Sequence, residues 1–167
     1  MKKNSILIMA FIAFLASACV TTGRLPPGQV QKRDASFGVT PVPHWQQKSF
    51  RGADLYFEHD QKNASIFFKA QCENISDSPL DALLAQEIIG LEQVNIEKEE
   101  RFIVADREAL VAEMSATIDG VPRFLKIMVL KKNRCVFDAV FSAPLADRDL
   151  VRDFDRMIET FRAEAAL

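Results

Sequence analysis

Histidine, tyrosine and tryptophan are scarce in this sequence of 167 residues, which contains two His, one Tyr and one Trp. The two histidines, His44 and His59, stand outside any Gly-x-Ser-x-Gly, His-Glu-x-x-His or glycine-rich phosphate-loop motif. A catalytic histidine needs a nucleophile and a residue that orients it. We therefore interpret both as turn or surface residues, and we predict a protein that is not an enzyme and has no catalytic, cofactor or metal site. An enzyme would need a cleft that gathers polar groups from distant strands.

The chain also lacks an excess of charge of either sign and a hydrophobic run of membrane-spanning length. It has 21 basic and 23 acidic residues, which argues against a nucleic-acid-binding face. Its longest apolar run, Ile6 to Leu15, is too short for a membrane-spanning helix, which needs about 20 residues. Thirteen phenylalanines indicate a core built on Phe, and the length is that of one domain.

The first residues have the pattern of an export signal. Lys2 and Lys3 precede the apolar run, and Ala16, Ser17 and Ala18 lead directly into Cys19. This pattern resembles the signal peptide of bacterial lipoproteins, although Ala16 stands where a Leu is usual. The resemblance implies cleavage before Cys19 and a diacylglyceryl group on its sulfur. The alternative is an ordinary secretory peptide, cleaved after Ala18, with Cys19 incidental.

Several acyl chains on Cys19 would give stable membrane anchoring, since each buried methylene contributes about 0.8 kcal/mol. By resemblance to enterobacterial sorting, the absence of Asp at position 20 favours the outer membrane, and we expect the protein to face the periplasm. Residues 19–36 have few apolar side chains and no periodicity. We interpret them as a flexible tether, the alternative being a docking segment for a partner. The predicted organisation is a signal peptide at 1–18, the lipidated Cys19 with its tether at 19–36, and one domain at 37–167.

The remaining cysteines are Cys72 and Cys135. Both fall in predicted strands, on the side shared with Phe68 and Phe137, so both side chains should point into the core. An exported chain meets an oxidising compartment, in which two thiols can pair. We predict a Cys72–Cys135 disulfide, the alternative being two buried thiols that never meet.

Alternating apolar residues predict the strands, and apolar residues at helical spacing predict two helices. The first helix should begin with Ser78 as its N-cap and Pro79 in the first turn. The second, capped by Asp147, should run over residues 148–163 with one apolar face. Tight turns such as Asp119-Gly120 make neighbouring strands antiparallel. Strands are predicted at 37–42, 53–59, 64–73, 95–104, 109–118, 122–131 and 134–142.

The predicted fold class is therefore α+β, with an antiparallel sheet of about six strands packed against two amphipathic helices. The order of elements resembles that of PsbP-like and DcrB-like domains. The residues that carry the resemblance are Trp45 after the first strand, Ser78 to Leu80 at the helix start, Asp119-Gly120 and Phe161 near the end. The resemblance implies this architecture and a role in binding or assembly without catalysis.

Two charged stretches have alternative interpretations. The run from Glu97 to Arg101 suits an edge strand, where it should guard against strand addition, although it could also accept a partner's strand. Asp54, Glu58 and Asp60 lie close together in sequence but lack the spacing of a known calcium loop. We interpret them as a solvated face.

Two functions fit these predictions. The first is a lipid-anchored, non-enzymatic envelope protein that binds or supports another envelope component. The alternative is a carrier of a small apolar ligand or lipid for an envelope transport system. An apolar cavity between a helix and the sheet would favour the carrier.

Overall fold

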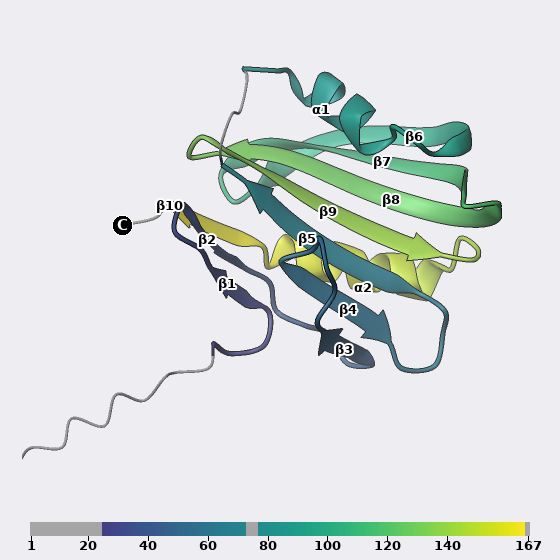
Figure 1. The fold of residues 1–167 in the computed structure, drawn as a ribbon, viewed down its shortest axis with the longest axis horizontal. Coiled ribbons are helices and arrows are strands. Elements are labelled where there is room, and N and C mark those ends of the chain that lie inside the picture. Colours follow the sequence, from purple (N-terminus) through teal and green to yellow (C-terminus); the bar gives the residue numbers. More distant parts are fainter. Residues whose placement is uncertain (1–24, 73–76, 166–167) are drawn as a thin grey trace, which may run out of the picture.

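The structure is a computed structural model that describes residues 25–72 and 77–165. Its main element is a seven-stranded sheet in the order β3-β4-β5-β9-β8-β7-β6, with every neighbouring pair antiparallel (Figure 1). The strands are β3 (Trp45–Lys48), β4 (Leu55–His59), β5 (Ser65–Gln71), β6 (Glu92–Val104), β7 (Arg107–Ile118), β8 (Val121–Lys132) and β9 (Cys135–Ala143).

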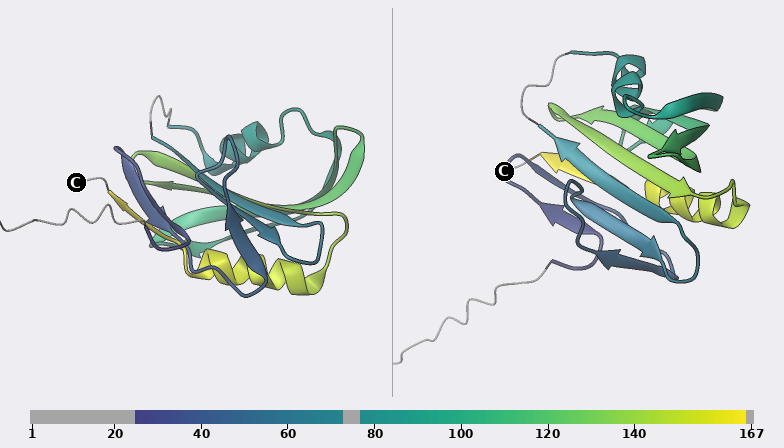
Figure 2. Two further views of the ribbon diagram at one scale, coloured as in Figure 1. Left: turned by 60° about the horizontal axis from the view of Figure 1, so that its bottom comes forward. Right: turned by 45° about the vertical axis from the view of Figure 1, so that its right-hand side comes forward.

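A second, three-stranded sheet joins the two ends of the described chain. It consists of β1 (Gln29–Gln31), β2 (Ala35–Gly38) and β10 (Arg162–Ala165), in the order β1-β2-β10. β2 pairs antiparallel with both neighbours, so Phe37 lies opposite Val30 on one side and Ala163 on the other. Figure 2 shows this small sheet beside one end of the large one.

Two helices cover opposite faces of the seven-stranded sheet. The buried stripe of α2 (Arg148–Glu159) packs on one face, where Phe154 joins a cluster with Phe137 and Phe141 of β9. The short α1 (Leu80–Glu87) covers part of the other face with Leu80, Leu83 and Leu84. The result is a three-layer arrangement of helix, sheet and helix.

Phenylalanine dominates the layer under α2, as its frequency in the sequence predicts. Five Phe side chains are almost completely buried: Phe57, Phe68, Phe137, Phe141 and Phe154. Several of their rings meet edge to face, which is a favourable geometry for aromatic pairs. Lys126 of β8, also buried, ties this face to α2 through an ion pair with Asp155 at 2.7 Å.

The predicted fold class is confirmed, and the strand number was underestimated. The described residues form ten strands, and β1, β3 and β10 were not predicted. Residues 29–36, which we assigned to the tether, form β1 and the start of β2, and Ala35 is buried. The folded domain therefore begins before residue 37, because β1 pairs with β2.

Both predicted helices are present with shifted ends. α1 begins at Leu80 with Pro79, not Ser78, as its N-cap residue. Asp147 caps α2 as predicted, accepting hydrogen bonds from the backbone N–H groups of Asp149 and Leu150. α2 ends at Glu159, and residues 162–165 form β10 in place of a last helical turn.

β6 is an edge strand, as its charge predicted. A register shift between Ile96 and Lys98 interrupts its pairing with β7. Lys98 pairs with Glu100, and Arg101 pairs with Asp81 and Glu108. Irregular pairing and charge are features that protect an edge from strand addition.

No helix in residues 25–72 and 77–165 is both long and apolar enough to cross a membrane.

Candidate functional site

The chain enters the folded domain through a tight turn just before β1. The backbone N–H of Gly28 donates to Oε1 of Gln47 on β3 at 2.7 Å, and that of Val39 donates to the Gly28 carbonyl at 2.8 Å. Gly28 has φ of +79°, and a Cβ at this position would lie 2.2 Å from the Val39 oxygen. The turn therefore requires glycine and fixes where the preceding residues leave the domain.

A groove of about 630 Å³, which we call the Leu25–Phe50 groove, lies between this turn and the β3–β4 loop. Leu25 and Pro27 line one part of it, and Lys48, Phe50 and Tyr56 line another. Leu25 is 44% exposed and Phe50 55% exposed, although both are apolar. The Phe50 ring stacks on Tyr56 with 4.8 Å between centroids.

The polar side of the groove is an ordered set of hydrogen bonds. The Tyr56 hydroxyl donates to Oε1 of Glu58 at 3.0 Å, and Lys48 binds the other carboxylate oxygen. The hydrogen bond from Lys48 and then that from Tyr56 lower the pKa of Glu58. Burial and the same carboxylate raise the pKa of Tyr56. Glu58 is therefore held as a hydrogen-bond acceptor between Lys48 and Tyr56.

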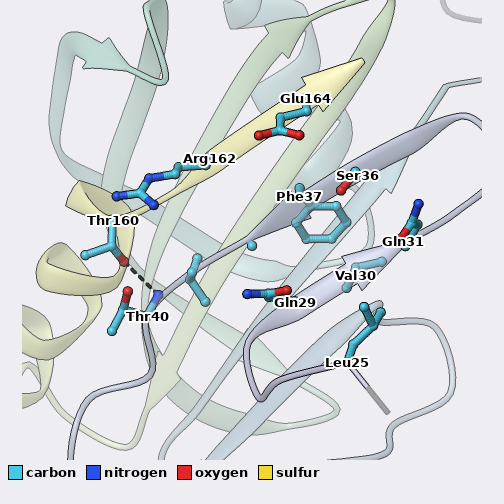
Figure 3. A pocket seen from close by; sticks show the side chains of 12 residues that line it. Leu25, Gln29, Val30, Gln31, Ser36, Phe37, Thr40, Thr160, Arg162 and Glu164 are labelled. Atoms are coloured by element: carbon cyan, nitrogen blue, oxygen red, sulfur yellow. Dashed lines mark hydrogen bonds between the residues drawn. The ribbon is translucent and has the colours of Figure 1, made fainter. Parts of the chain in front are cut away.

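A second cavity, of about 270 Å³, lies on the three-stranded sheet, and Leu25 lines it too (Figure 3). Phe37 lies on its β2 wall, and Arg162 and Glu164 of β10 stand at its other side. The Thr160 hydroxyl accepts a hydrogen bond from the Thr40 backbone N–H at 2.8 Å. Neither cavity lies between a helix and the seven-stranded sheet, where the carrier hypothesis expects its ligand.

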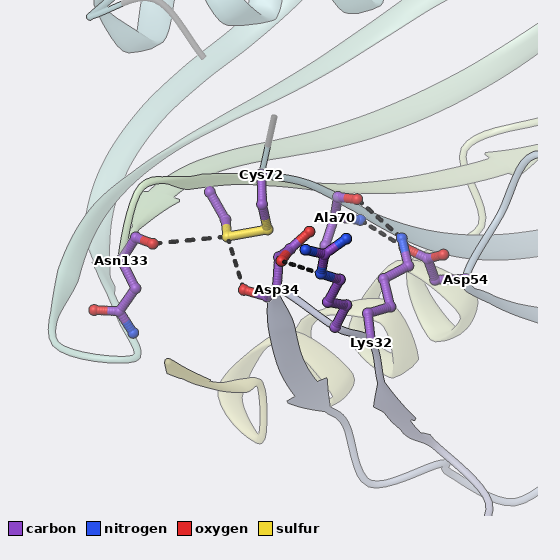
Figure 4. Close-up of a disulfide and its surroundings, with 8 residues drawn as sticks. Lys32, Asp34, Asp54, Ala70, Cys72 and Asn133 are labelled. Atoms are coloured by element: carbon purple, nitrogen blue, oxygen red, sulfur yellow. Dashed lines mark hydrogen bonds and ion pairs between the residues drawn. A yellow bond between two sulfur atoms is a disulfide. The ribbon is translucent and has the colours of Figure 1, made fainter. Parts of the chain in front are cut away.

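Cys72 and Cys135 form a disulfide, as the sequence predicted (Figure 4). Their sulfurs are 2.08 Å apart and their Cα atoms 4.0 Å apart. The bond continues the β5–β9 ladder, whose last pair is Gln71 with Val136. It therefore joins the end of β5 to the start of β9, which correspond to the strands predicted at 64–73 and 134–142.

Beside the disulfide, a lysine ties the β1–β2 turn to the large sheet. Lys32 pairs with Asp54 and donates to the Ala70 carbonyl at 3.0 Å. Asp54 in turn accepts from the Ala70 backbone N–H at 2.8 Å (Figure 4). The N-terminal hairpin is thus fixed to the end of β5.

Each of the acidic residues that lie close in sequence has its own basic partner, and the two histidines lie together. Asp54 pairs with Lys32, Glu58 with Lys48, and Asp60 with His44 at 3.1 Å. The rings of His44 and His59 stack with 6.0 Å between centroids. Within the part of the chain that the structure describes, no three His, Cys, Asp or Glu side chains are placed to hold a metal ion.

Sequence reasoning missed a buried carboxylate, Asp138. It lies on β9, on the face under α1, and is 6% exposed. Its Oδ1 atom has no hydrogen-bond partner among the described residues. Burial, and then the charge of Glu87 on α1, raise its pKa to about 7, whereas Lys69 of β5 acts in the opposite direction. The available signal was a charged residue between Val136 and Val140, on the second apolar face of a strand buried on both sides.

The leader and Cys19 lie outside the described residues, so the lipid-anchor assignment stays a prediction.

Comparison with known proteins identifies the fold. No protein-family model matches the chain, and no curated protein does. Among solved structures, cyanobacterial PsbP (CyanoP) from Synechocystis is 12% identical, with a TM-score of 0.53 over 86% of this chain and 99% of that one. LpqN of Mycobacterium tuberculosis, described as involved in cell envelope biogenesis, is 14% identical, with a TM-score of 0.57 over 81% of this chain and 88% of that one.

A third structure, PA94 of Pseudomonas aeruginosa, a protein of unknown function, is 14% identical with a TM-score of 0.51. The match covers 70% of this chain and 95% of that one. The chain therefore has a PsbP-like fold, as its element order predicted. At these identities the likeness shows the fold alone.

Proposed function

We propose that this protein is an envelope lipoprotein, anchored through lipid on Cys19, which binds or supports another envelope component without catalysing a reaction. We place it at the outer membrane, facing the periplasm. The observation that carries the proposal is the leader, in which two lysines, an apolar run and three small residues end at Cys19.

The disulfide supports export. A Cys72–Cys135 bond is typical of a protein that matures in an oxidising compartment, and it is unusual in cytosolic proteins. The comparison with LpqN, a protein of cell envelope biogenesis, points in the same direction. An interaction surface toward another envelope component, protein or membrane, is supported by two apolar side chains, Leu25 and Phe50, that are exposed on one groove.

The lipid is tested by metabolic labelling of the full chain in a bacterial host with an alkyne analogue of palmitate. We expect label on the natural chain and none on Cys19→Ser. The matched control is the double variant Cys72→Ser/Cys135→Ser, which keeps Cys19 and should label like the natural chain. Intact mass should give Cys19 as first residue, and density-gradient fractions should contain the protein with outer-membrane markers.

An unlabelled soluble protein whose first residue follows a different cleavage site would overturn the lipid anchor. Label recovered with inner-membrane markers would overturn only the location.

The binding role is tested by crosslinking in intact cells, followed by detergent extraction and mass spectrometry. We expect one envelope protein to be captured reproducibly by the natural chain. Repeated failure to capture any protein would contradict this role. A lipid that stays bound in native mass spectra and is lost on denaturation would favour the carrier.

A further inference from the structure

The covalent distance between the proposed lipid and the folded domain is short. Cys19 is six residues before Leu25, the first described residue, and Gly28 is fixed against β3 three residues later. A chain spans at most about 3.6 Å per residue, whatever its conformation. Leu25 must therefore stay within about 20 Å of Cys19, which is less than the diameter of a small domain.

This limit determines which side of the domain is next to the lipid. Leu25 lines both cavities, the one on the three-stranded sheet and the Leu25–Phe50 groove. In Figure 1, β1 and β2 lie at one end of the molecule, and the turn between β7 and β8 lies at the opposite end. A tether of this length brings the first end to the membrane and leaves the second end pointing away.

The side chains on this end suit a bilayer surface. Phe50 is 55% exposed at the tip of the β3–β4 loop, where the Ala53 N–H closes a turn on the Phe50 carbonyl. Arg51 follows it, is exposed, and forms no ion pair with any described residue. An aromatic side chain beside a cation is typical of segments that lie in the interface between headgroups and acyl chains.

We propose that the surface formed by Leu25, Phe50 and Arg51 rests on the lipid bilayer, with the Phe50 ring at the level of the headgroups and Arg51 beside the phosphates. This inference depends on the proposed lipid on Cys19, which holds the surface at the membrane. Phe50 and Leu25 add a second, weak contact that sets the orientation of the domain. The β7–β8 turn and the β6 edge then remain available to partners in the periplasm.

The test uses the full lipidated chain in vesicles of phosphatidylcholine and phosphatidylglycerol that contain a lipid with a headgroup-level nitroxide quencher. One variant carries Phe50→Trp. The matched control is Val121→Trp at the β7–β8 turn, because Val121 is 56% exposed and lies at the far end of the sheet. Trp45 is buried in both variants, so its fluorescence is a constant background.

We expect the quencher to remove roughly half of the fluorescence added at position 50 and almost none of that added at position 121. Equal quenching at both positions would overturn the proposal, as would a blue shift at position 50 without quenching, which would indicate that a second copy of the chain covers residue 50.

Flotation of the natural chain with the vesicles separates the two proposals. A chain that floats but is not quenched at position 50 retains its lipid anchor and lacks the proposed orientation. If the natural chain is recovered without lipid and does not float, the lipid anchor is overturned, and the proposed orientation is overturned with it.

Discussion

Asp138 is a buried carboxylate with one oxygen that is unpartnered among the described residues, an environment that is unusual for an aspartate. A carboxylate that is 94% buried usually has a cationic partner or several hydrogen bonds. Here Lys69 is the register partner on β5, and the Glu87 carboxylate faces it from α1. The burial of Glu87 raises its own pKa as well. The layer under α1 therefore holds two acidic groups that resist ionisation.

This arrangement predicts a stability that falls as pH rises. The pKa of Asp138 is about 7 in the folded state, against an ordinary value of 3.8. Between these pH values Asp138 is protonated in the folded state and ionised in the unfolded state. Its contribution to the free energy of unfolding is therefore fully present below pH 4 and lost by about pH 7. At roughly 1.4 kcal/mol per pH unit, the effect is at most about 4 kcal/mol.

We therefore expect Asp138→Asn to be more stable than the natural chain at pH 8, with the difference disappearing at low pH. Urea unfolding of both proteins at several pH values between 4 and 8 measures this difference in the free energy of unfolding. Asp81→Asn is a control of opposite sign, because the hydrogen bond from Arg101 lowers the pKa of Asp81. That substitution should destabilise at neutral pH and lose its effect under acid conditions. Parallel curves for Asp138→Asn and the natural chain would contradict the raised pKa.

At the scale of elements, the turn into β1 depends on one glycine. The Cβ in Gly28→Ala would meet a backbone oxygen, Val39 O, which cannot move as a side chain does. Added to the cost of a left-handed backbone, this should reduce the free energy of unfolding by about 3 kcal/mol or more. Gly52→Ala is the matched control, with φ of +103° and no atom within 4 Å of its Cβ. It should cost about 1–2 kcal/mol, and equal costs in denaturant unfolding would contradict the clash.

The long elements were predictable, and the short ones were not. β7, β8 and β9 are rich in apolar residues over nine or more positions, and α2 has a clear apolar stripe and a capping Asp147. β1 and β10 are three and four residues long and exist because each pairs with β2. The sequence of β10, Arg-Ala-Glu-Ala, favours a helix, and the pairing overrides that local preference.

Of the two candidate sites, the disulfide was predictable from the sequence and the Leu25–Phe50 groove was not. Strand parity alone was sufficient to place Cys72 and Cys135 on one side. The Leu25–Phe50 groove was not predictable, because it depends on a turn and a loop that are 25 residues apart and that only tertiary packing brings together.

At the scale of the whole molecule, the disulfide closes a long loop. Cys72 and Cys135 are 63 residues apart, and the loop includes α1, β6, β7 and β8. Constraint of the unfolded chain by such a loop stabilises the fold by roughly 4 kcal/mol. We expect Cys72→Ser/Cys135→Ser to unfold at lower urea concentration, and reductant to bring the natural chain to the same midpoint. The double variant should not respond to reductant, and two free thiols in the denatured, unreduced natural domain would contradict the bond.

The position of β10 beside β2 has a consequence for how the molecule is completed. β2 lies near the beginning of the chain, at residues 35–38. Its second partner, β10, is formed by residues 162–165, near the other end. If the chain is exported N-terminus first and anchored at Cys19, as we propose, this corner cannot close until the last strand arrives. The corner between β2 and β10 would then be the final part of the domain to form, and Phe37, whose ring contacts Phe161 in the folded domain, would be covered last.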